Sequence, residues 1–229
     1  MTEALNGIED SVALSAPRRR AAPRQRDADQ TKINILEAAL AEFADKGLAG
    51  ARVDEIANKT SASKHMIYYY FGNKEGLYQA VLKRAYDNFR IAEQAVDYAS
   101  LDPVEAMRSL IGQTFDMHVQ NPLSVRIIMG ENLNNGEHIA KVDGLDERRA
   151  ILVTVEQILT RGVKSGQFRD GLDPLQIHMT ASALSFYFIA NRFTFGMIFG
   201  LNYKSAAVVT AHRTEIIETV LRYCLKNGS

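Results

Sequence analysis

The apolar residues of this chain recur with the spacing of α-helices, and no stretch of useful length alternates between apolar and polar residues as a β-strand would. One clear apolar stripe, at positions i, i+3, i+7 and i+10, is formed by Ile33, Leu36, Leu40 and Phe43. Gly47 follows as a natural C-terminal stop. We therefore expect an all-α protein with helices over residues 29–46, 53–59, 63–69, 74–96, 103–119, 122–133, 146–164, 174–199 and 205–226.

Residues 52–71 are the most informative segment, because two short helices joined by a tight turn are expected there. Ser63 is expected to cap the second of these helices, and Ile67 to anchor it inward. Consecutive helix positions are about 100° apart, so the phenols of Tyr68, Tyr69 and Tyr70 cannot all face one core. A helix of this kind, with part of its polar and aromatic face exposed, can enter the major groove of DNA.

The start of the following helix carries a cation in an unusual place. Asn73 is a good cap, and Lys74 then lies on the first turn, where the positive end of the helix dipole disfavours a cation. A phosphate held by Lys74 and the free backbone N–H groups of that turn would explain the placement. The alternative is that Lys74 is merely solvated and that the tyrosines cover a small core.

Several short motifs with fixed spacing connect these features to a known family. They are, in chain order, Ile35 to Ala39, Phe43-Ala44, Gly47, Ile56-Ala57, Ser63-Lys64, Ile67 to Phe71 and Asn73 to Leu77. Together they resemble the TetR family of one-component bacterial transcriptional regulators, over roughly residues 29–89.

The resemblance implies a helix-turn-helix DNA-binding domain in residues 29–89, with the helix-turn-helix itself at 52–71, and a C-terminal effector-binding and dimerisation domain in residues 90–229. It implies a ligand-responsive regulator, in the family's usual mode a repressor. Such a protein binds a palindromic operator in double-stranded DNA as a homodimer and is released by a small-molecule effector. The residues that we expect to contact DNA are Arg52, Ser63, Lys64, His65, Met66, Tyr68, Tyr69, Tyr70 and Lys74.

Two positions depart from the family's usual pattern. Arg52 stands where a capping Thr is common, which puts the cap of the first short helix in question but could bring Arg52 itself to DNA. Ser61 stands where the turn usually has Gly, and a positive φ at Ser61 would cost about 1 kcal/mol or more.

A second function, of a different class, is a helical small-molecule-binding or scaffold protein that keeps the helix-turn-helix shape without reading DNA sequence. Four residues that carry or can gain a positive charge surround one exposed helix, namely Arg52, Lys64, His65 and Lys74. A scaffold has no need of them, so they favour the DNA-binding regulator.

The charge of the chain is unevenly distributed. Its 27 Lys and Arg balance its 27 Asp and Glu, but between residues 59 and 84 the acidic Glu75 is outnumbered by Lys59, Lys64, Lys74, Lys83 and Arg84. The local field, rather than the net charge, decides affinity for nucleic acid. Residues 1–28 lack periodicity and are rich in arginine, so we expect a disordered basic tail. The tail either adds DNA contacts as an arm or is a solubilising leader.

The resemblance also implies a small-molecule cavity whose occupancy would move the helix over 74–96 and change the spacing of the two recognition helices. The candidate lining residues are Phe115, His118, Met129, Phe186, Tyr187 and Asn191. An aromatic stripe at helical spacing is, however, also typical of an ordinary core. Asn191 and Arg192 interrupt an apolar helix and need polar partners, which could be a ligand, water, a second subunit, or Glu215 and Glu218 of the last helix.

The last expected helix bears on whether the chain forms a dimer. Its apolar residues come in doublets, which make an apolar stripe wider than packing against one neighbouring face requires. The doublets are Val208-Val209, Ile216-Ile217, Val220-Leu221 and Cys224-Leu225. In the resembled family the last two long helices of each subunit form a four-helix interface, so we expect a homodimer through residues 174–199 and 205–226. A fully intramolecular core is the alternative.

Other classes of function find no support in the sequence. The single Cys224 excludes an intrachain disulfide, and His118, Glu131, His138 and His178 lack the compact spacing of metal ligands. No catalytic or phosphate-loop motif is present, so we expect no enzyme activity, no cofactor and no metal. No window has the roughly 18 unbroken apolar residues of a membrane span, and the first residues do not resemble a signal peptide. We therefore expect no membrane partner and a cytoplasmic location.

Overall fold

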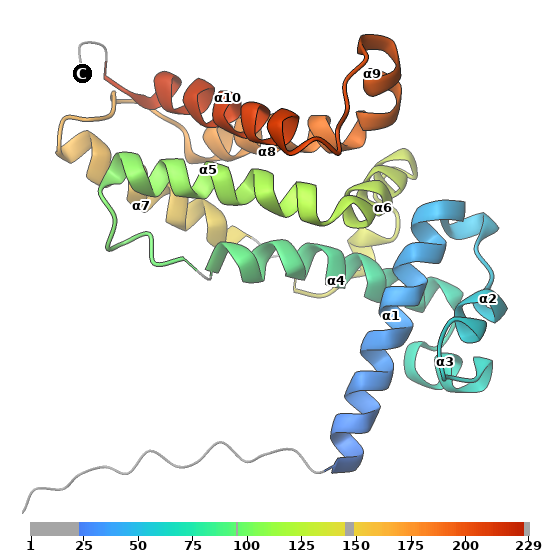
Figure 1. Cartoon of the computed structure of the whole chain (residues 1–229). Coiled ribbons are helices and arrows are strands. Elements are labelled where there is room, and N and C mark those ends of the chain that lie inside the picture. Colours follow the sequence, from blue (N-terminus) through green and yellow to red (C-terminus); the bar gives the residue numbers. More distant parts are fainter. Residues whose placement is uncertain (1–22, 95, 145–148, 227–229) are drawn as a thin grey trace, which may run out of the picture.

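The computed structural model describes residues 23–94, 96–144 and 149–226, which form two helical units that share one long helix (Figure 1). The first unit comprises α1 (Pro23–Gly50), α2 (Val53–Asn58), α3 (Lys64–Phe71) and the N-terminal half of α4 (Lys74–Gln94). The second comprises the rest of α4, α5 (Pro103–Gln120), α6 (Pro122–Leu133), the 3-10 helix η1 (Ile139–Lys141), α7 (Ala150–Lys164), α8 (Pro174–Ala190), α9 (Arg192–Phe199) and α10 (Ala206–Cys224). Within the described ranges, β-type pairing is limited to an isolated bridge between Phe168 and Leu225, so the predicted all-α class is confirmed.

Polar caps explain where three of the helices begin. Ser63 accepts a hydrogen bond from the amide of Met66 at 3.1 Å, and Asp102 and Asp173 accept from amides two residues later at 3.0 and 2.8 Å. In α5 and α8 a proline follows the cap at the first helical position, where its missing N–H costs nothing. The predicted starts of these helices are therefore confirmed.

α1 begins at Pro23 rather than at residue 29, so the prediction of a disordered tail is wrong for residues 23–28. Proline is compatible with a first helical turn, and the polar residues that follow carry no apolar period that would reveal a helix. The predicted stop is confirmed, because helical geometry is interrupted at Gly47, with φ 67° and ψ 174°. The rest of the predicted tail, residues 1–22, lies outside the described residues.

Other predicted boundaries agree with the structure within two residues, which is the usual scatter of helix ends. The exceptions are the predicted helices over 146–164 and 174–199. The structure begins α7 at Ala150, and residues 146–148 of the prediction lie outside the described residues.

The predicted single helix over 174–199 is wrong, because Asn191 separates α8 from α9 with φ −100° and ψ 6°. Its Nδ2 donates to the Tyr187 carbonyl at 3.2 Å, and Arg192 Nη1 donates to the Ile189 carbonyl at 2.7 Å. The backbone amide of Asn191 also donates to these two carbonyls, so the two polar side chains add to the hydrogen bonds that end α8. The ion pair of Arg192 with the last helix, which was one of the alternatives, is not found among the described residues, and Glu218 pairs instead with Arg108 on α5, at 2.7 Å.

Each helix of the first unit buries an apolar anchor in a small core. Ile35 of α1, Ile56 of α2, Ile67 of α3 and Leu77 of α4 are all 0% exposed. Burying one such side chain stabilises the fold by about 1.5–3 kcal/mol. The predicted inward anchor of α3, Ile67, is confirmed.

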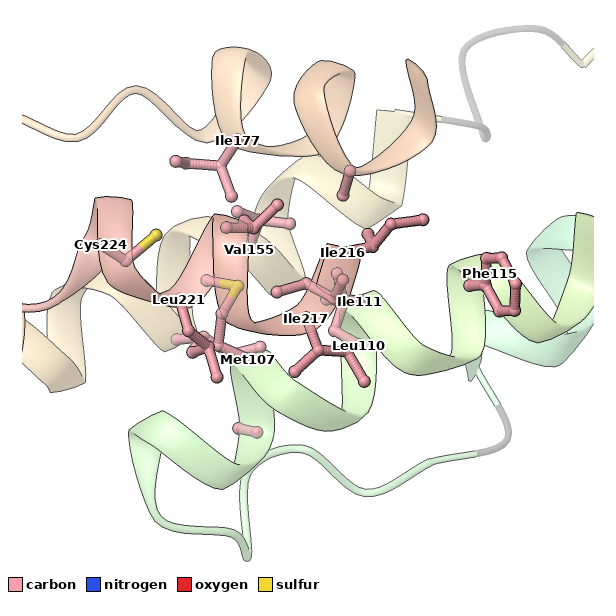
Figure 2. Close-up of a cluster of buried hydrophobic side chains, with 14 of the residues drawn as sticks. Met107, Leu110, Ile111, Phe115, Val155, Ile177, Ile216, Ile217, Leu221 and Cys224 are labelled. Atoms are coloured by element: carbon pink, nitrogen blue, oxygen red, sulfur yellow. The ribbon is translucent and has the colours of Figure 1, made fainter. Parts of the chain in front are cut away.

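The core of the second unit forms where α5, α7, α8 and α10 meet (Figure 2). The apolar doublets of α10 belong to this core, since Ile216, Ile217, Val220, Leu221 and Cys224 are at most 4% exposed. Most of the apolar stripe that we expected to meet a second copy of the chain is therefore buried within the chain itself, and Val208, Val209 and Leu225 are partly buried against the same core. A dimer through this helix cannot use the five fully buried residues.

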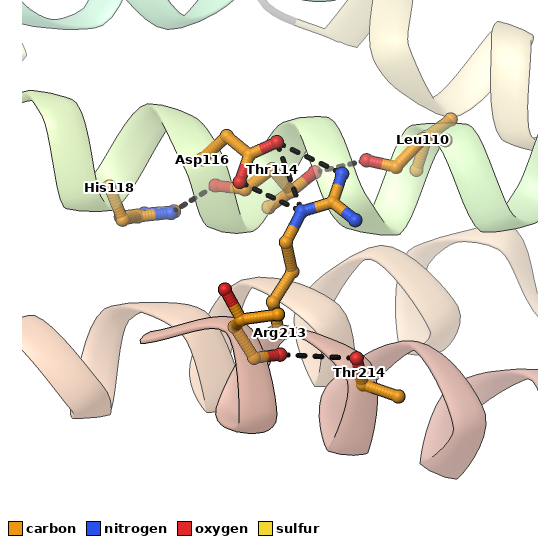
Figure 3. Close-up of polar contacts among 7 residues, drawn as sticks. Leu110, Thr114, Asp116, His118, Arg213 and Thr214 are labelled. Carbon is orange, nitrogen blue, oxygen red and sulfur yellow. Dashed lines mark hydrogen bonds and ion pairs between the residues drawn. The ribbon is translucent and has the colours of Figure 1, made fainter. Parts of the chain in front are cut away.

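A bidentate ion pair fixes α10 against α5 (Figure 3). Arg213 Nε lies 2.9 Å from Asp116 Oδ1, and Arg213 Nη2 lies 3.0 Å from Oδ2. Gly112 makes room for the guanidinium, because a Cβ there would lie 2.4 Å from Arg213 Nη2. The planar fork of arginine gives this contact a defined geometry.

A buried carboxylate organises the first unit. Glu42 of α1 is 1% exposed and accepts hydrogen bonds from Lys46 Nζ at 2.8 Å, Lys59 Nζ at 3.0 Å and the Arg52 amide at 3.3 Å. The bond from Lys46, aided by the other two, lowers the pKa of Glu42 to about 2, against the effect of burial. Glu42 thus ties α1 to both ends of α2.

We predict that Glu42→Gln destabilises the protein at pH 7 by about 1–3 kcal/mol, because the variant loses charge-assisted hydrogen bonds. The pKa of Glu42 is depressed in the folded state, so its contribution is complete above the ordinary value of 4.5 and is lost as the pH falls toward about 2. Urea unfolding followed by circular dichroism at several pH values measures the difference. Glu37→Gln, which removes an exposed partner of Arg84, is the control and should change stability little at any pH. An equal loss for Glu42→Gln at pH 7 and near pH 2 would contradict the assignment.

Candidate nucleic-acid interface and ligand cavity

α3 buries one face and presents the other to solvent. Ile67 lies in the first core, whereas Tyr69 is 77% exposed, which confirms that the three tyrosines do not share one core. The other predicted contact residues of this helix are exposed or half-buried, namely Ser63, Lys64, His65, Met66, Tyr68 and Tyr70. The helix thus presents a continuous polar and aromatic surface.

A cation from α1 lies next to this surface. Lys32 Nζ is 5.1 Å from the centre of the Tyr70 ring, and the rings of Tyr69 and Tyr70 meet edge to face at 5.4 Å. The ring of Tyr70 therefore joins α1 to α3 and adds a positive charge beside the exposed face.

Lys64 is paired with Asp54 of α2, with Nζ and Oδ1 2.9 Å apart and both side chains about half exposed. The hydrogen bond that Lys64 donates to Asp54 raises the pKa of Lys64, so its ammonium stays charged. Exposed pairs contribute at most about 1 kcal/mol. A phosphate or base edge can therefore replace Asp54 as the partner of Lys64 at little cost.

The two departures from the family pattern have different outcomes. Arg52 precedes α2 without a side-chain capping bond, and its backbone amide is bound by Glu42 instead. Ser61 does not adopt a positive φ, since Asn135 is the one non-glycine residue with a positive φ in the described part of the chain. The turn between α2 and α3 therefore forms without the strain that Ser61 would have caused.

Lys74 is not merely solvated, because it makes a hydrogen bond within the chain. Its Nζ donates to the carbonyl of Ala49 at 3.1 Å, at the C-terminal end of α1. Asn73 caps α4 as predicted, accepting from the amide of Gly76 at 2.8 Å. Both residues border a depression of about 360 Å³ that also includes Leu48. An ammonium has three donors, so Lys74 keeps capacity for a second partner such as a phosphate oxygen.

A cavity of about 310 Å³ that is partly open to solvent lies between α4, α5, α6, α7 and α8 of the second unit. Most of its wall is apolar, from Tyr86, Phe89, Met117, Ile128, Ile151 and Phe186. Its polar residues are Thr114, His118, His178 and Ser182. A concave, mostly apolar site with a few polar groups is typical of small-molecule binding.

Only two of the six predicted effector residues, His118 and Phe186, line this cavity. Phe115 is fully buried and packs on Phe188, while Met129 lies beside the core of the second unit. Of the remaining two, Tyr187 is exposed and borders a groove on the outer surface, and Asn191 lies at the C-terminal end of α8.

Sequence reasoning missed the polar face that α8 turns into the cavity. His178, Ser182 and Phe186 follow one another at intervals of four residues, so all three share one side of the helix. The spacing of these two polar residues in an otherwise apolar helix could have identified them in the sequence as cavity residues.

The two histidines of the cavity are uncharged near neutral pH. Burial lowers the pKa of both His118 and His178, and the proximity of His178 lowers that of His118 further. His118 Nδ1 lies 2.7 Å from the Thr114 carbonyl (Figure 3), which can only accept, so Nδ1 carries the proton. The remaining ring nitrogen, Nε2, is then an acceptor. His178 Nδ1 is buried without a hydrogen-bond partner among the described residues.

A second polar cluster joins the two units. Glu131 of α6 is 2% exposed and accepts from the backbone amides of His138 and Ile139 at 2.7 and 2.8 Å. The His138 ring meets Tyr78 of α4 edge-on at 5.1 Å, and burial, with the neighbouring Glu131 carboxylate, raises the pKa of Tyr78. Glu131 therefore holds the segment after α6 against α4.

No group of three His, Cys, Asp or Glu side chains in the described residues is placed to hold a metal ion. Nor does any helix in those ranges have the length and apolar character needed to cross a membrane.

Two family models match the chain. Residues 35–81 match the model of bacterial regulatory proteins of the tetR family, and residues 103–220 match a tetracyclin repressor-like C-terminal domain. The first match contains the helix-turn-helix, and the second contains most of the helices that enclose the cavity.

Known relatives agree with these matches. The chain is 31% identical over 205 residues to the HTH-type transcriptional repressor NicS of Pseudomonas putida, covering 89% of this chain and 97% of that protein. It is 29% identical over 153 residues to the HTH-type transcriptional regulator RutR of Escherichia coli, covering 66% of this chain and 70% of RutR. The crystal structure of SCO4942 from Streptomyces coelicolor matches with a TM-score of 0.64 at 25% identity, over 85% of this chain and 98% of that one. The chain therefore belongs to the tetR family of bacterial regulatory proteins and is a helix-turn-helix transcriptional regulator.

Proposed function

We propose that the protein is a homodimeric repressor that binds a palindromic operator through α3 and releases it when a small molecule occupies the cavity. The observation that carries this proposal is the two-faced α3, held by the buried Ile67 and exposing Lys64, His65 and Tyr69. Two such helices, related by a two-fold axis and about one DNA turn apart, would read the two halves of a palindrome.

The contacts to DNA divide by the position of each side chain. Phosphate contacts are proposed for residues at the edges of the helix-turn-helix, namely Arg52, Ser63, Tyr70 and Lys74. Base or sugar contacts are proposed for the exposed first turns of α3, namely Lys64, His65, Met66, Tyr68 and Tyr69. Because the partner is genomic DNA, we place the protein in the cytoplasm, where it acts without catalysis or a cofactor.

Exposed apolar residues on α8 support dimerisation through α8 and α10. Leu175, Met179 and Tyr187 are each more than half exposed and, with the exposed Ala183, recur every four residues. The helix contains no Asp, Glu, Lys or Arg. Exposed small residues of α10, such as Ala211, would let a second copy approach closely. A large uncharged surface of this kind is typical of an interface between subunits.

The cavity and the DNA-binding unit share α4. Tyr86 and Phe89 form part of the cavity wall, and Leu77 and Leu82 lie in the first core. A ligand that fits the cavity better at one position of α4 would shift the equilibrium between two spacings of the recognition helices.

We predict that Lys74→Ala weakens binding to all DNA sequences alike and lowers the slope of log K against log salt by about one, because one phosphate contact is lost. Fluorescence anisotropy with labelled duplexes over a range of salt concentrations measures the slope. Lys141→Ala, which removes an exposed lysine of η1, serves as the control and should leave the slope unchanged. An unchanged slope in Lys74→Ala would remove this residue from the phosphate contacts.

Changes at Lys64 or His65 are expected to alter base preference. Each replacement by Ala should cost about 1–3 kcal/mol at one position of the site and relax selectivity there, because a direct base contact is lost. Affinities for duplexes that carry single base-pair changes measure this. If relative affinities across those duplexes stay fixed, neither residue reads bases, and a scaffold function gains support.

Met179→Asp should convert the dimer into monomers, because it places two carboxylates near the two-fold axis of an apolar interface. Sedimentation velocity should then show the 25.5 kDa chain mass instead of twice that value. Val153→Asp, which changes an apolar residue of α7 that is 54% exposed, is the matched control and should stay dimeric. A Met179→Asp variant that remains a dimer would exclude the α8 surface.

A further inference from the structure

The cavity wall favours a flat, uncharged ligand. Among the described residues that line it, none is Asp, Glu, Lys or Arg. Aromatic rings form much of the wall, with His118 5.1 Å from Phe89 at an interplanar angle of 32° and 5.8 Å from Phe186 at 85°. Rings that are tilted by 32° in one pair and nearly perpendicular in the other complement the faces and edges of an aromatic ligand. The volume of about 310 Å³ limits the ligand to a small molecule.

The polar groups of the cavity call for a hydrogen-bond donor. His118 commits Nδ1–H to the Thr114 carbonyl, so Nε2 is left as an acceptor. The Thr114 hydroxyl donates to the Leu110 carbonyl at 2.9 Å and is also left with acceptor capacity. His178 adds a buried ring nitrogen without a partner in the described residues. Polar atoms that line a cavity are normally satisfied, and a ligand that donates would satisfy Nε2 of His118, while Nδ1 of His178 takes a donor or an acceptor according to its tautomer.

We propose that the cavity binds an uncharged aromatic molecule carrying a hydroxyl or N–H group that donates a hydrogen bond to Nε2 of His118. The inference rests on the proposed function, because it names the ligand class of the proposed effector cavity. A carboxylate ligand would face the acceptor Nε2 of His118 and no lysine or arginine among the described lining residues, and an ammonium ligand would face no carboxylate there. Either charged ligand would therefore lose hydration without gaining an ionic partner.

Four probes with one common ring system test the ligand class. They are 2-naphthol, 2-methoxynaphthalene, 2-naphthoate and 2-naphthylmethylammonium, titrated into the full chain by calorimetry at neutral pH without DNA. We expect 2-naphthol to bind about tenfold more tightly than 2-methoxynaphthalene, which can only accept. We expect the anion and the cation to bind more weakly still. Tightest binding by either charged probe, equal binding of the two neutral probes, or binding by none of them would overturn the proposal.

Two histidine variants identify the residue that carries the preference. His118→Phe keeps a flat ring in the cavity wall and should abolish the preference for 2-naphthol while leaving the affinity for 2-methoxynaphthalene unchanged. His65→Phe, on the exposed face of α3, is the matched control and should keep the preference. A preference that survives in His118→Phe would contradict the role of Nε2. The ranking of the four probes by the unsubstituted protein decides the ligand class even if His118→Phe fails to fold.

The failure of this inference can be told apart from failure of the proposed function. If the protein binds a specific DNA site but its affinities for the four probes do not follow the expected order, the DNA-binding function stands and the proposed ligand class is wrong. If the protein binds the four probes in the expected order of affinity but selects no DNA sequence, the proposed ligand class stands and the repressor function is wrong.

Discussion

The arrangement of both units depends on the burial of α4 on two sides. Leu77 and Leu82 are completely buried in the first core, and Tyr86 and Phe89, further along the same helix, form part of the cavity wall. Close-packed interiors do not deform continuously, so a change at one end of a helix is passed to the other. In our proposal, a molecule in the cavity acts on DNA binding because it acts on this one helix.

The Glu131 cluster gives α6 a comparable role. Ile128 lines the cavity one helical turn before Glu131, whose carboxylate holds the His138 segment beside Tyr78 of α4. A buried carboxylate bound by two amides resists displacement, because each lost hydrogen bond would leave a polar group unsatisfied. Two of the helices that line the cavity, α4 and α6, therefore also hold the DNA-binding unit in place. Glu42 plays the corresponding part inside that unit, where it binds α1 to α2.

Most features that could be predicted from the sequence depend on interactions between residues close together in the chain. The Ser63 cap, the Asp-Pro helix starts and the inward Ile67 follow from interactions within a few residues, and the structure confirms them. The cavity required long-range information. Phe115 and Phe186 look alike in the sequence, but only packing decides that the first is core and the second faces the cavity. The break at Asn191 also escaped prediction, because apolar residues continue on both sides of it.

The most direct test of the account is the selection of binding sites from a pool of random duplex DNA by the purified full chain at moderate salt. The account predicts enrichment of a palindrome whose half-sites are centred about one helical turn, or a multiple of it, apart. It also predicts one dimer, or a whole number of dimers, on each site. Weak binding that depends on salt without any enriched sequence would contradict it, as would enrichment of a single half-site bound by one chain.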